Sequence, residues 1–268
     1  MQENRNMTDQ TGSQPDGMYM EVLQLAGRII MENGGETYRA EETVNRMGTG
    51  LGLEEVDSFA VPSGLFISYR GRNGDPVTGV RRVRQQDRNL TRVNDANQVS
   101  REIVSGSMDC GEAYRRLRYI EKCPGDFPGL CCLPAAFLCA AGFSTIFGGA
   151  VPDILIAGTV AAIVQLTETF VRRNRSRGLA ASVLGGLLTT LLPYLLHIRF
   201  PALQTEIIIA GAIMPLVPGL AMANAVQDAM RGDMLSGLSH GVKAIITACM
   251  IAGGTLLAMG MMNLMAGG

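Results

Sequence analysis

The chain has 268 residues, of which 23 are Lys or Arg and 24 are Asp or Glu, giving a net charge of −1. This balance leaves no basic excess to neutralise phosphates and argues against nucleic acid as the main partner. The charges are unevenly placed, because residues 1–129 carry 35 of the 47 and residues 130–268 carry only 12. A soluble domain needs charged groups over its whole surface, so this distribution excludes a wholly soluble protein.

The amino-terminal part has the patterns of a polar tail and a small α+β domain. Residues 1–17 are rich in polar side chains, Gly and Pro and are predicted to be a disordered tail. They contain no basic-then-apolar signal peptide, so we expect the first apolar span to direct insertion. Residues 18–124 form the domain. Its predicted elements, in chain order, are a helix from Met18 to Gly34-Gly35, a helix over 37–51, strands at 56–61, 65–69 and 78–84, and helices at 89–105 and 108–122.

The carboxyl-terminal part, residues 130–268, contains long stretches with few or no charged side chains. A helix needs about 20 apolar residues to cross a ~30 Å hydrocarbon core. We therefore predict a membrane protein in which a cytoplasmic α+β domain is followed by a five-helix transmembrane α bundle. The expected spans lie at about 130–151, 154–171, 179–197, 207–226 and 243–265. The alternative, buried helices in a large soluble protein, would need a polar shell that this part does not contain.

The arginines between the predicted spans indicate an orientation. Basic residues precede span one, lie between spans two and three, and lie between spans four and five, whereas Arg199 is the one basic residue expected on the other side. By the positive-inside rule the amino terminus is expected in the cytoplasm and the carboxyl terminus outside.

The chain lacks the common sequence motifs of metal sites and nucleotide-binding sites. The six cysteines form no CxxC pair, and neither His197 nor His240 has a spaced set of further metal ligands. No P-loop or GxGxxG motif occurs. We expect no metal site, no cofactor, no catalytic residue and no ATP-driven pumping by this chain.

Predicted span four contains the most informative pattern. Pro215 and Pro218-Gly219 lie roughly 12–18 Å along the span at 1.5 Å per residue, near the bilayer midplane. Proline lacks an N–H group and clashes with the preceding turn, so the helix is expected to kink or break there. A half-helix starting near Gly219 would direct its positive dipole end at a ligand such as a carboxylate. Asn224 and Asp228 then share one face of that helix. The alternative is a kinked packing helix in which Asp228 is an interfacial cap.

Glu168 is the other acidic residue expected inside a span. An ionised group in mid-span costs roughly 2.5–3.5 kcal/mol, which makes proton carriage one interpretation, with Gln165 as a polar neighbour one turn deeper. The other interpretation is a pair with Arg172, four residues later, that reaches the cytoplasmic interface. Asp153, next to Pro152, is expected to be a turn residue.

Three blocks of residues resemble the ThrE-type threonine/serine exporters. The first is Gly35-Glu36-Thr37-Tyr38-Arg39-Ala40-Glu41-Glu42-Thr43. The second comprises Arg82-Val83, Asn89-Leu90 and Asn97-Gln98-Val99-Ser100-Arg101. The third comprises Pro218-Gly219, Asn224, Asp228, Gly232-Asp233 and Ser236-Gly237.

The resemblance extends in order over residues 18–265 and implies a multi-pass secondary exporter of small hydrophilic metabolites in a bacterial cytoplasmic (inner) membrane. Threonine and serine are the chief substrates of this family, and one split pair is associated with succinate export. Single-chain members carry a further block of about five spans, so this chain resembles the larger, amino-terminal subunit of the split form. The implied partner is a small integral-membrane subunit that supplies the second block.

The leading hypothesis is a proton-driven exporter subunit that works by alternating access. Asp228 and Glu168 would carry protons, while Pro218, Gly219, Asn224 and Asp228 would bind substrate, with the Pro218-Gly219 break facing a similar break in the partner. The first alternative is dicarboxylate (succinate) export by the same machinery, which the absence of a central Arg or Lys in the spans disfavours. The second is a membrane-anchored sensor or hydrolase-like domain, for which a midplane break would be unnecessary. The coupling ion and assembly into homo-oligomers are left open.

Five polar residues of the soluble domain form a further candidate set. They could line a cleft that selects, gates or senses substrate, or they could cap helices and form surface ion pairs worth about 0–1 kcal/mol each. The five are Glu36, Thr37, Arg39, Arg82 and Arg101.

Overall fold

The computed structural model describes residues 16–71, 74–84, 89–123, 131–172 and 178–266. The chain divides into two compact units. The first comprises Met1–Asp126 together with Asn224–Ser239, and the second comprises Phe127–Ala223 together with His240–Gly268. The tail expected over residues 1–17 lies almost wholly outside the described residues, because α1 begins at Asp16.

The first unit contains helices α1 (Asp16–Glu32), α2 (Thr37–Gly50), α3 (Leu90–Val104) and α4 (Cys110–Lys122), and strands β1 (Glu54–Val61), β2 (Gly64–Arg70) and β3 (Pro76–Arg82). The order helix–helix–strands–helix–helix is the one that the sequence predicts. Observed bounds differ from the predicted ones by about two residues, and β3 ends at Arg82 rather than at residue 84.

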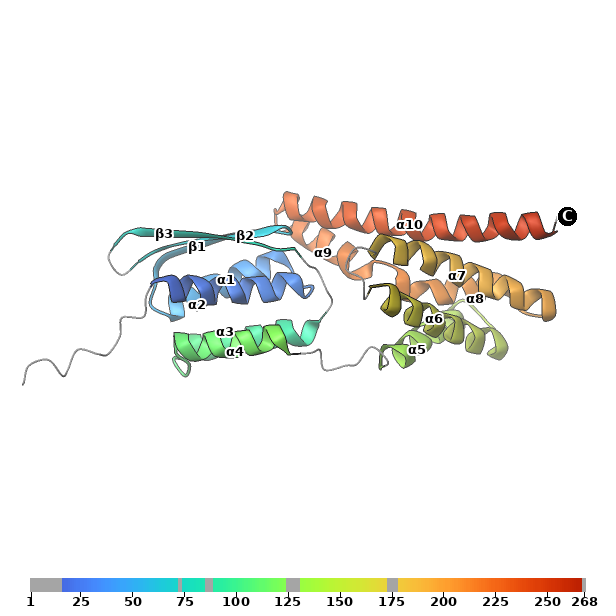
Figure 1. Cartoon of the computed structure of the whole chain (residues 1–268), viewed down its shortest axis with the longest axis horizontal. Helices are drawn as coiled ribbons and strands as arrows, with labels where there is room; N and C mark the ends of the chain where they lie inside the picture. Colours follow the sequence, from blue (N-terminus) through green and yellow to red (C-terminus); the bar gives the residue numbers. More distant parts are fainter. Residues whose placement is uncertain (1–15, 72–73, 85–88, 124–130, 173–177, 267–268) are drawn as a thin grey trace, which may run out of the picture. The chain divides into compact units, whose positions relative to one another are not determined.

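These elements form three layers: the sheet, then α1 and α2, then α3 and α4 (Figure 1). The sheet is antiparallel in the order β1-β2-β3. Alternate residues of β2 point to opposite faces, so Leu65, Ile67 and Tyr69 are buried on the helix-covered side. The outer face carries Phe59, Phe66 and Val80, which are paired in register and exposed. One continuous core therefore fills the space between the sheet and the helices.

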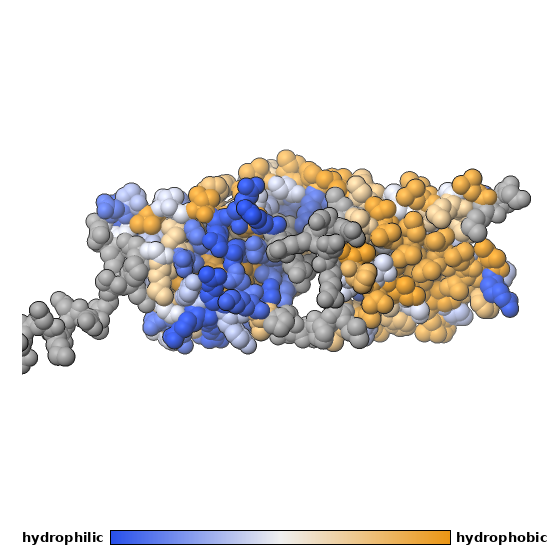
Figure 2. All heavy atoms as spheres, in the orientation of Figure 1, coloured by the Kyte–Doolittle hydropathy of each residue, from blue (hydrophilic) through white to orange (hydrophobic). Residues whose placement is uncertain are grey.

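The second unit is made of apolar helices. It contains α5 (Cys132–Ile146), α6 (Val151–Arg172), α7 (Gly178–Arg199), α8 (Thr205–Ile213), the 3-10 turn η2 (Met214–Leu216), the start of α9 (Gly219–Met230) and most of α10 (Met234–Ala266). Large apolar side chains are exposed along these helices, for example Leu155, Leu166 and Phe170 on α6. Figure 2 shows this surface in orange. Exposed apolar side chains on this scale fit a lipid environment and do not fit water.

Within the described residues, three helices are long and apolar enough to cross a membrane: Val151–Val171, Ala180–Arg199 and Met234–Leu264. If the bent pair of helices Thr205–Leu216 and Gly219–Met230 counts as one broken span, the number of candidate spans rises to four. The stretch expected to be span one forms the helix α5 of only 15 residues, because Gly148 has a φ of 86° and ends it at a turn. At 1.5 Å per residue α5 is about 22 Å long, shorter than a full span.

Helices α7 and α10 approach each other closely at two glycines. A Cβ atom at Gly186 would overlap the carbonyl group of Ile251, and one at Gly254 would overlap that of Val183. Small residues allow such contact between helix backbones in lipid, where dispersion replaces the hydrophobic effect as the packing force.

Candidate functional site

The fourth apolar segment is broken between α8 and α9. The helix α8 ends at Ile213, η2 follows with Pro215, and α9 begins at Gly219. Val217 lies before Pro218 and has the extended ψ of 131°, as the proline ring demands of its neighbour. The two helices are bent by 57° relative to each other. The break expected from Pro218-Gly219 is therefore present.

The amino-terminal end of α9 has open space around its first residue. Pro218 is buried, whereas Gly219 is exposed and a Cβ atom there would meet nothing within 4 Å. Met222 N–H donates to Pro218 O at 3.0 Å, so the helical ladder starts here. Gly219 N–H donates to Val217 O at 2.8 Å, so the amides of Leu220 and Ala221 are the ones without an acceptor within the helix, and they lie at the positive end of the helix dipole. This end of α9 has the polarity to receive a carboxylate.

Asn224 and Asp228 lie on one face of α9, in the part of the helix that belongs to the first unit. Their side chains are 5% and 0% exposed. Thr37, the first residue of α2, is 2% exposed and its hydroxyl donates to Asp228 Oδ1 at 3.1 Å. The same hydroxyl lies 3.4 Å from Asp233 Oδ2. The amino-terminal end of α2 therefore meets two carboxylates, where the helix dipole stabilises negative charge.

A tight turn holds the two carboxylates in this arrangement. Gly232 has a φ of 90°, which lets the chain reverse between α9 and α10. Asp233 then caps α10, because Ser236 N–H donates to its Oδ1 at 3.0 Å. A Cβ atom at Gly237 would lie 2.9 Å from Ala225 O, so only glycine allows the α10 backbone to approach α9 so closely.

Tyr38, next to Thr37, makes a second set of contacts with the same turn. Gln227 Nε2 donates to its hydroxyl at 3.2 Å, and the Arg231 guanidinium carbon lies 3.5 Å from its ring centroid. The stacked arginine forms a cation–π contact. Arg39 Nε also donates to the Tyr38 hydroxyl at 3.2 Å and pairs with Glu36 at 3.0 Å, and both contacts raise the pKa of the guanidinium.

Glu41 adds a third acidic group to this region. It accepts a hydrogen bond from Ala60 N–H at 2.7 Å. Burial is the main cause that raises the pKa of its carboxyl above the ordinary value of 4.5, and the charges of Asp233, Asp57 and Asp228 raise it further, while the Ala60 bond opposes them.

The structure brings some of the predicted site residues together and leaves others apart. Glu36, Thr37 and Arg39 lie at the amino-terminal end of α2, beside Asp228 or its neighbours. Arg101 instead bonds Gln98 on the exposed side of α3, and Arg82 is exposed at the end of β3.

Glu168 lies in α6, in the second unit, with a partly buried side chain. The side chain of Arg172, its expected partner, is outside the described residues. The roles of all these residues remain predictions. Asp153 is 2% exposed and accepts from Ala150 N–H at 3.1 Å and Gln204 N–H at 3.0 Å, so it caps α6 and ties the α7–α8 loop to it.

Sequence reasoning did not assign roles to several side chains that complete the site: Tyr38, Glu41, Gln227, Arg231 and Asp233. A signal for three of them was present, because Tyr38, Glu41 and Asp233 lie within the blocks that carry the family resemblance. The first and third blocks meet at Thr37 and Asp228, and the first meets the second where the Thr43 hydroxyl donates to Asn97 Oδ1 at 3.1 Å. Motifs that are far apart in sequence thus share one neighbourhood.

The site has the chemistry of proton or polar-ligand binding. A buried carboxylate with a hydroxyl donor can hold or release a proton, and neutral amides such as Asn224 can bind polar groups. In the part of the chain that the structure describes, no group of three or more His, Cys, Asp or Glu side chains is arranged to hold a metal ion.

Comparison with known proteins assigns the family. Residues 21–262 match the model of the ThrE family, described as "Putative threonine/serine exporter". A "Probable succinate transporter subunit YjjP" from Klebsiella aerogenes is 22% identical over 88% of this chain and 90% of that protein. A "Probable threonine/serine exporter" from Mycobacterium tuberculosis and a "Threonine/serine exporter" from Corynebacterium glutamicum are each 22% identical over 87% of this chain.

The relatives fall into two lengths. The aligned region spans 90% of the YjjP protein but only 45% and 50% of the two threonine/serine exporters, about half of their length. No solved structure matches the chain. With a family match over most of its length and apolar helices that can cross a membrane, the chain is an integral membrane protein that belongs to the ThrE family of threonine/serine exporters, whose members are transporters and not enzymes.

Proposed function

We propose that this chain is one subunit of a secondary exporter that moves small hydrophilic amino acids, threonine and serine, out of the cell. Transport proceeds by alternating access and is coupled to protons. The observation that carries the proposal is that one helix, α9, begins at a break in an apolar segment and carries a fully buried acid, Asp228, nine residues later.

The break supplies the substrate site. Irregular backbone at membrane depth is tolerated where it lines a polar cavity, and a half-helix start attracts the carboxylate of an amino acid. Gly219 leaves room for close approach because it has no side chain and open space around it. Pro218 fixes the break, and Asn224, one turn beyond the first, offers an amide to the polar groups of the substrate.

Asp228 supplies the coupling proton. In its ionised form the carboxylate accepts the Thr37 hydroxyl, and the amino-terminal end of α2 favours that charge. Protonation weakens this charge-assisted bond and loosens the turn around Gly232 from α2. Proton binding would then favour one conformation of the transporter and proton release would favour the other, as alternating access requires. Glu168 would be a second carrier within α6.

The proposed assembly has two halves. The apolar segments of this chain form five spans in total, counting α5 and the broken pair, with the α+β domain in the cytoplasm and the carboxyl terminus outside. The positive-inside distribution of arginines supports this orientation. Because the longer relatives are about twice the aligned length and YjjP is named a subunit, we propose that a small membrane partner supplies a second set of spans.

Dicarboxylate export by the same machinery is the alternative, and the name of the YjjP relative favours it. A dianion needs cationic groups around it, and the predicted spans contain no central Arg or Lys. The groups that this chain offers, the amino-terminal end of α9 and the neutral amide of Asn224, suit a ligand with a single carboxylate better than a dicarboxylate.

Reconstitution with the partner in proteoliposomes tests the proposal. Efflux of labelled threonine and succinate is measured with and without a pH gradient, for the wild type, Asp228→Asn and the matched buried-acid control Asp153→Asn. We expect Asp228→Asn to lose stimulation by the gradient while the control keeps it. Gradient-stimulated efflux in Asp228→Asn equal to the wild type would refute the role of Asp228. Faster efflux of succinate than of threonine by the wild type would favour the alternative cargo.

A further inference from the structure

The turn after α9 places a basic side chain beside the two carboxylates. Arg231 directly follows α9 and its N–H donates to Asp228 O at 3.1 Å, while Asp233 N–H donates to the same carbonyl at 3.0 Å. Oppositely charged residues three positions apart in a helix attract each other. Within the described residues, however, Arg231 forms no ion pair with either acid. A different group therefore holds its guanidinium.

That group is the ring of Tyr38. The Arg231 guanidinium carbon lies 3.5 Å from the ring centroid, in a stacked cation–π contact that stabilises an arginine without a carboxylate. Two hydrogen bonds fix the ring, because Gln227 Nε2 and Arg39 Nε each donate to the Tyr38 hydroxyl at 3.2 Å. Arg39 is itself compensated by Glu36 at 3.0 Å. Tyr38 thus holds Arg231 on its face and is anchored through its hydroxyl.

Among the described residues, most of the charged groups around Asp228 are acids. From α2 come Glu36 and Glu41, and from the turn come Asp233 and Arg231. The next titratable group along α10 is the buried His240. Like charges oppose the ionisation of a carboxylic acid, whereas a neighbouring arginine promotes it. The position of the Arg231 guanidinium therefore affects how readily Asp228 takes up a proton.

We propose that Tyr38 is a positioning residue for proton coupling, whose ring holds Arg231 away from Asp228 and Asp233 so that these carboxylates can take up and release a proton. An arginine paired directly with Asp228 would keep the acid ionised throughout the transport cycle. A stacked arginine stays beside the acids without fixing their charge. The link to transport rests on the proposed function, whereas the effect on the titration of Asp228 rests on the contacts of Tyr38 and Arg231.

Removal of the ring should release the arginine. Arg231 is exposed, so its long side chain is free to reorient once the stacking partner is gone. Leucine fills part of the space of the tyrosine ring but offers no π face to a cation. In Tyr38→Leu we therefore expect the guanidinium to turn to the carboxylates of Asp228 and Asp233 and to favour their ionised forms.

Infrared difference titration of the full-length protein in nanodiscs tests this expectation. The signal followed is the protonated-carboxyl band that Asp228→Asn removes. Because Asp228 and Asp233 share the Thr37 hydroxyl, the midpoint of this signal belongs to the pair. We expect Tyr38→Leu to lower the midpoint by about 0.5–1 pH unit, a small shift for a neighbouring arginine because solvent screens the exposed Arg231.

Three further variants separate the ring from the rest of the tyrosine. Tyr38→Phe keeps the ring and should titrate as the wild type does. Arg231→Lys keeps the charge and the ring but loses planar stacking, so it should lower the midpoint as Tyr38→Leu does. In an Arg231→Gln background Tyr38→Leu should have no effect on the midpoint, because no arginine is left to release.

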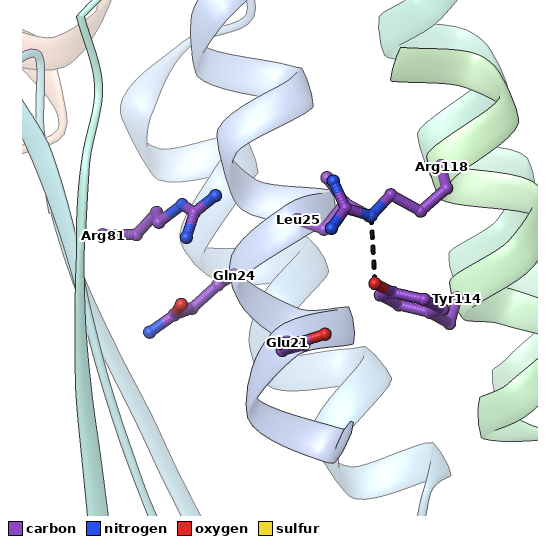
Figure 3. A pocket seen from close by; sticks show the side chains of 6 residues that line it. All are labelled: Glu21, Gln24, Leu25, Arg81, Tyr114 and Arg118. Atoms are coloured by element: carbon purple, nitrogen blue, oxygen red, sulfur yellow. Dashed lines mark hydrogen bonds between the residues drawn. The ribbon is translucent and has the colours of Figure 1, made fainter. Parts of the chain in front are cut away.

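Tyr114→Leu is the matched control. Tyr114 on α4 is also half-buried and contacts an arginine, since Arg118 Nε donates to its hydroxyl at 3.1 Å (Figure 3). Arg118 pairs with Glu121 at 3.0 Å, so loss of the Tyr114 ring releases no unpaired cation. The midpoint of the Asp228 signal should not move in this variant.

Efflux measurements distinguish a failure of this inference from a failure of the proposed function. The pH dependence of gradient-stimulated threonine efflux should shift to lower pH in Tyr38→Leu by the same amount as the titration. An unchanged midpoint in Tyr38→Leu and Arg231→Lys, or an equal fall of the midpoint when residue 231 is Gln, would overturn the role of Tyr38 and leave Asp228-dependent efflux standing. A midpoint that falls as expected, in a protein whose efflux ignores the pH gradient, would support the positioning of Arg231 by Tyr38 and refute the proposed function.

Discussion

The contact between Thr37 and Asp228 gives the sharpest prediction, because the chain provides its own control. Replacing Thr37 by Val keeps the shape of the side chain and removes the hydroxyl that Asp228 accepts at 3.1 Å. Thr43→Val makes the same change at a buried position of the same helix, where the hydroxyl donates to the neutral Asn97 at 3.1 Å. The two variants differ mainly in the charge of the acceptor.

The magnitudes follow from that difference in charge. A hydrogen bond to a charged group contributes about 1.5–3 kcal/mol and one between neutral groups about 0.5–1.5 kcal/mol. Both threonines are nearly inaccessible, at 2% and 7% exposed, so water cannot easily replace either bond. We expect Thr37→Val to make opening of residues 224–239 roughly 10 to 150 times more frequent, at a factor of ten per ~1.4 kcal/mol.

Hydrogen exchange read by mass spectrometry measures this opening segment by segment, because exchange of protected amides follows local opening. In Thr37→Val the peptides covering 224–239 should exchange faster than in the wild type. In Thr43→Val the exchange of these peptides should be unchanged, and the peptides of α2 and α3 should exchange faster instead. In an Asp228→Asn background, the increase in exchange caused by Thr37→Val should fall to the size expected for the loss of a hydrogen bond between neutral groups. Unchanged exchange of 224–239 in Thr37→Val, or an equal increase in Thr43→Val, would refute the reasoning.

Three further predictions concern other parts of the chain. Gly186→Ala should lower the melting temperature in detergent, because its Cβ overlaps the Ile251 carbonyl and overpacking costs about 1–3 kcal/mol, whereas Gly253→Ala, with nothing within 4 Å, should not. Glu41→Gln should increase stability at pH 7. The raised pKa of Glu41 means that its stabilising contribution is complete below pH 4.5 and lost as the pH rises through the raised value, so denaturation curves of the variant should depend less on pH in that window. Asp153→Ala should reduce thermal stability by about 1–3 kcal/mol, since two backbone N–H groups lose their acceptor; an unchanged melting curve would contradict this.

The break at Pro218-Gly219 is the part of the site that the sequence could predict. Proline acts through its own covalent geometry, so its effect on the helix needs no knowledge of distant residues. The length of α5 was harder to predict, because apolar composition continues through residues 147–151 while a single glycine with positive φ ends the helix. Hydropathy measures solvent preference and does not report such a turn.

Local patterns determined much of this protein. Charge distribution separated the apolar from the polar part, periodicity gave the order of helices and strands in the first unit, and motif blocks gave the family. The tertiary structure decided which of the polar residues act together. Thr37 and Asp228 are 191 positions apart, and their contact exists because a tight turn at Gly232 and the close approach at Gly237 place α9 against the first turn of α2. Arg82 and Arg101 belong to the same set of candidate polar residues in the sequence, yet both lie at exposed positions elsewhere in the first unit. Long-range proximity depends on the packing of whole elements, and the pattern of a single segment does not contain it.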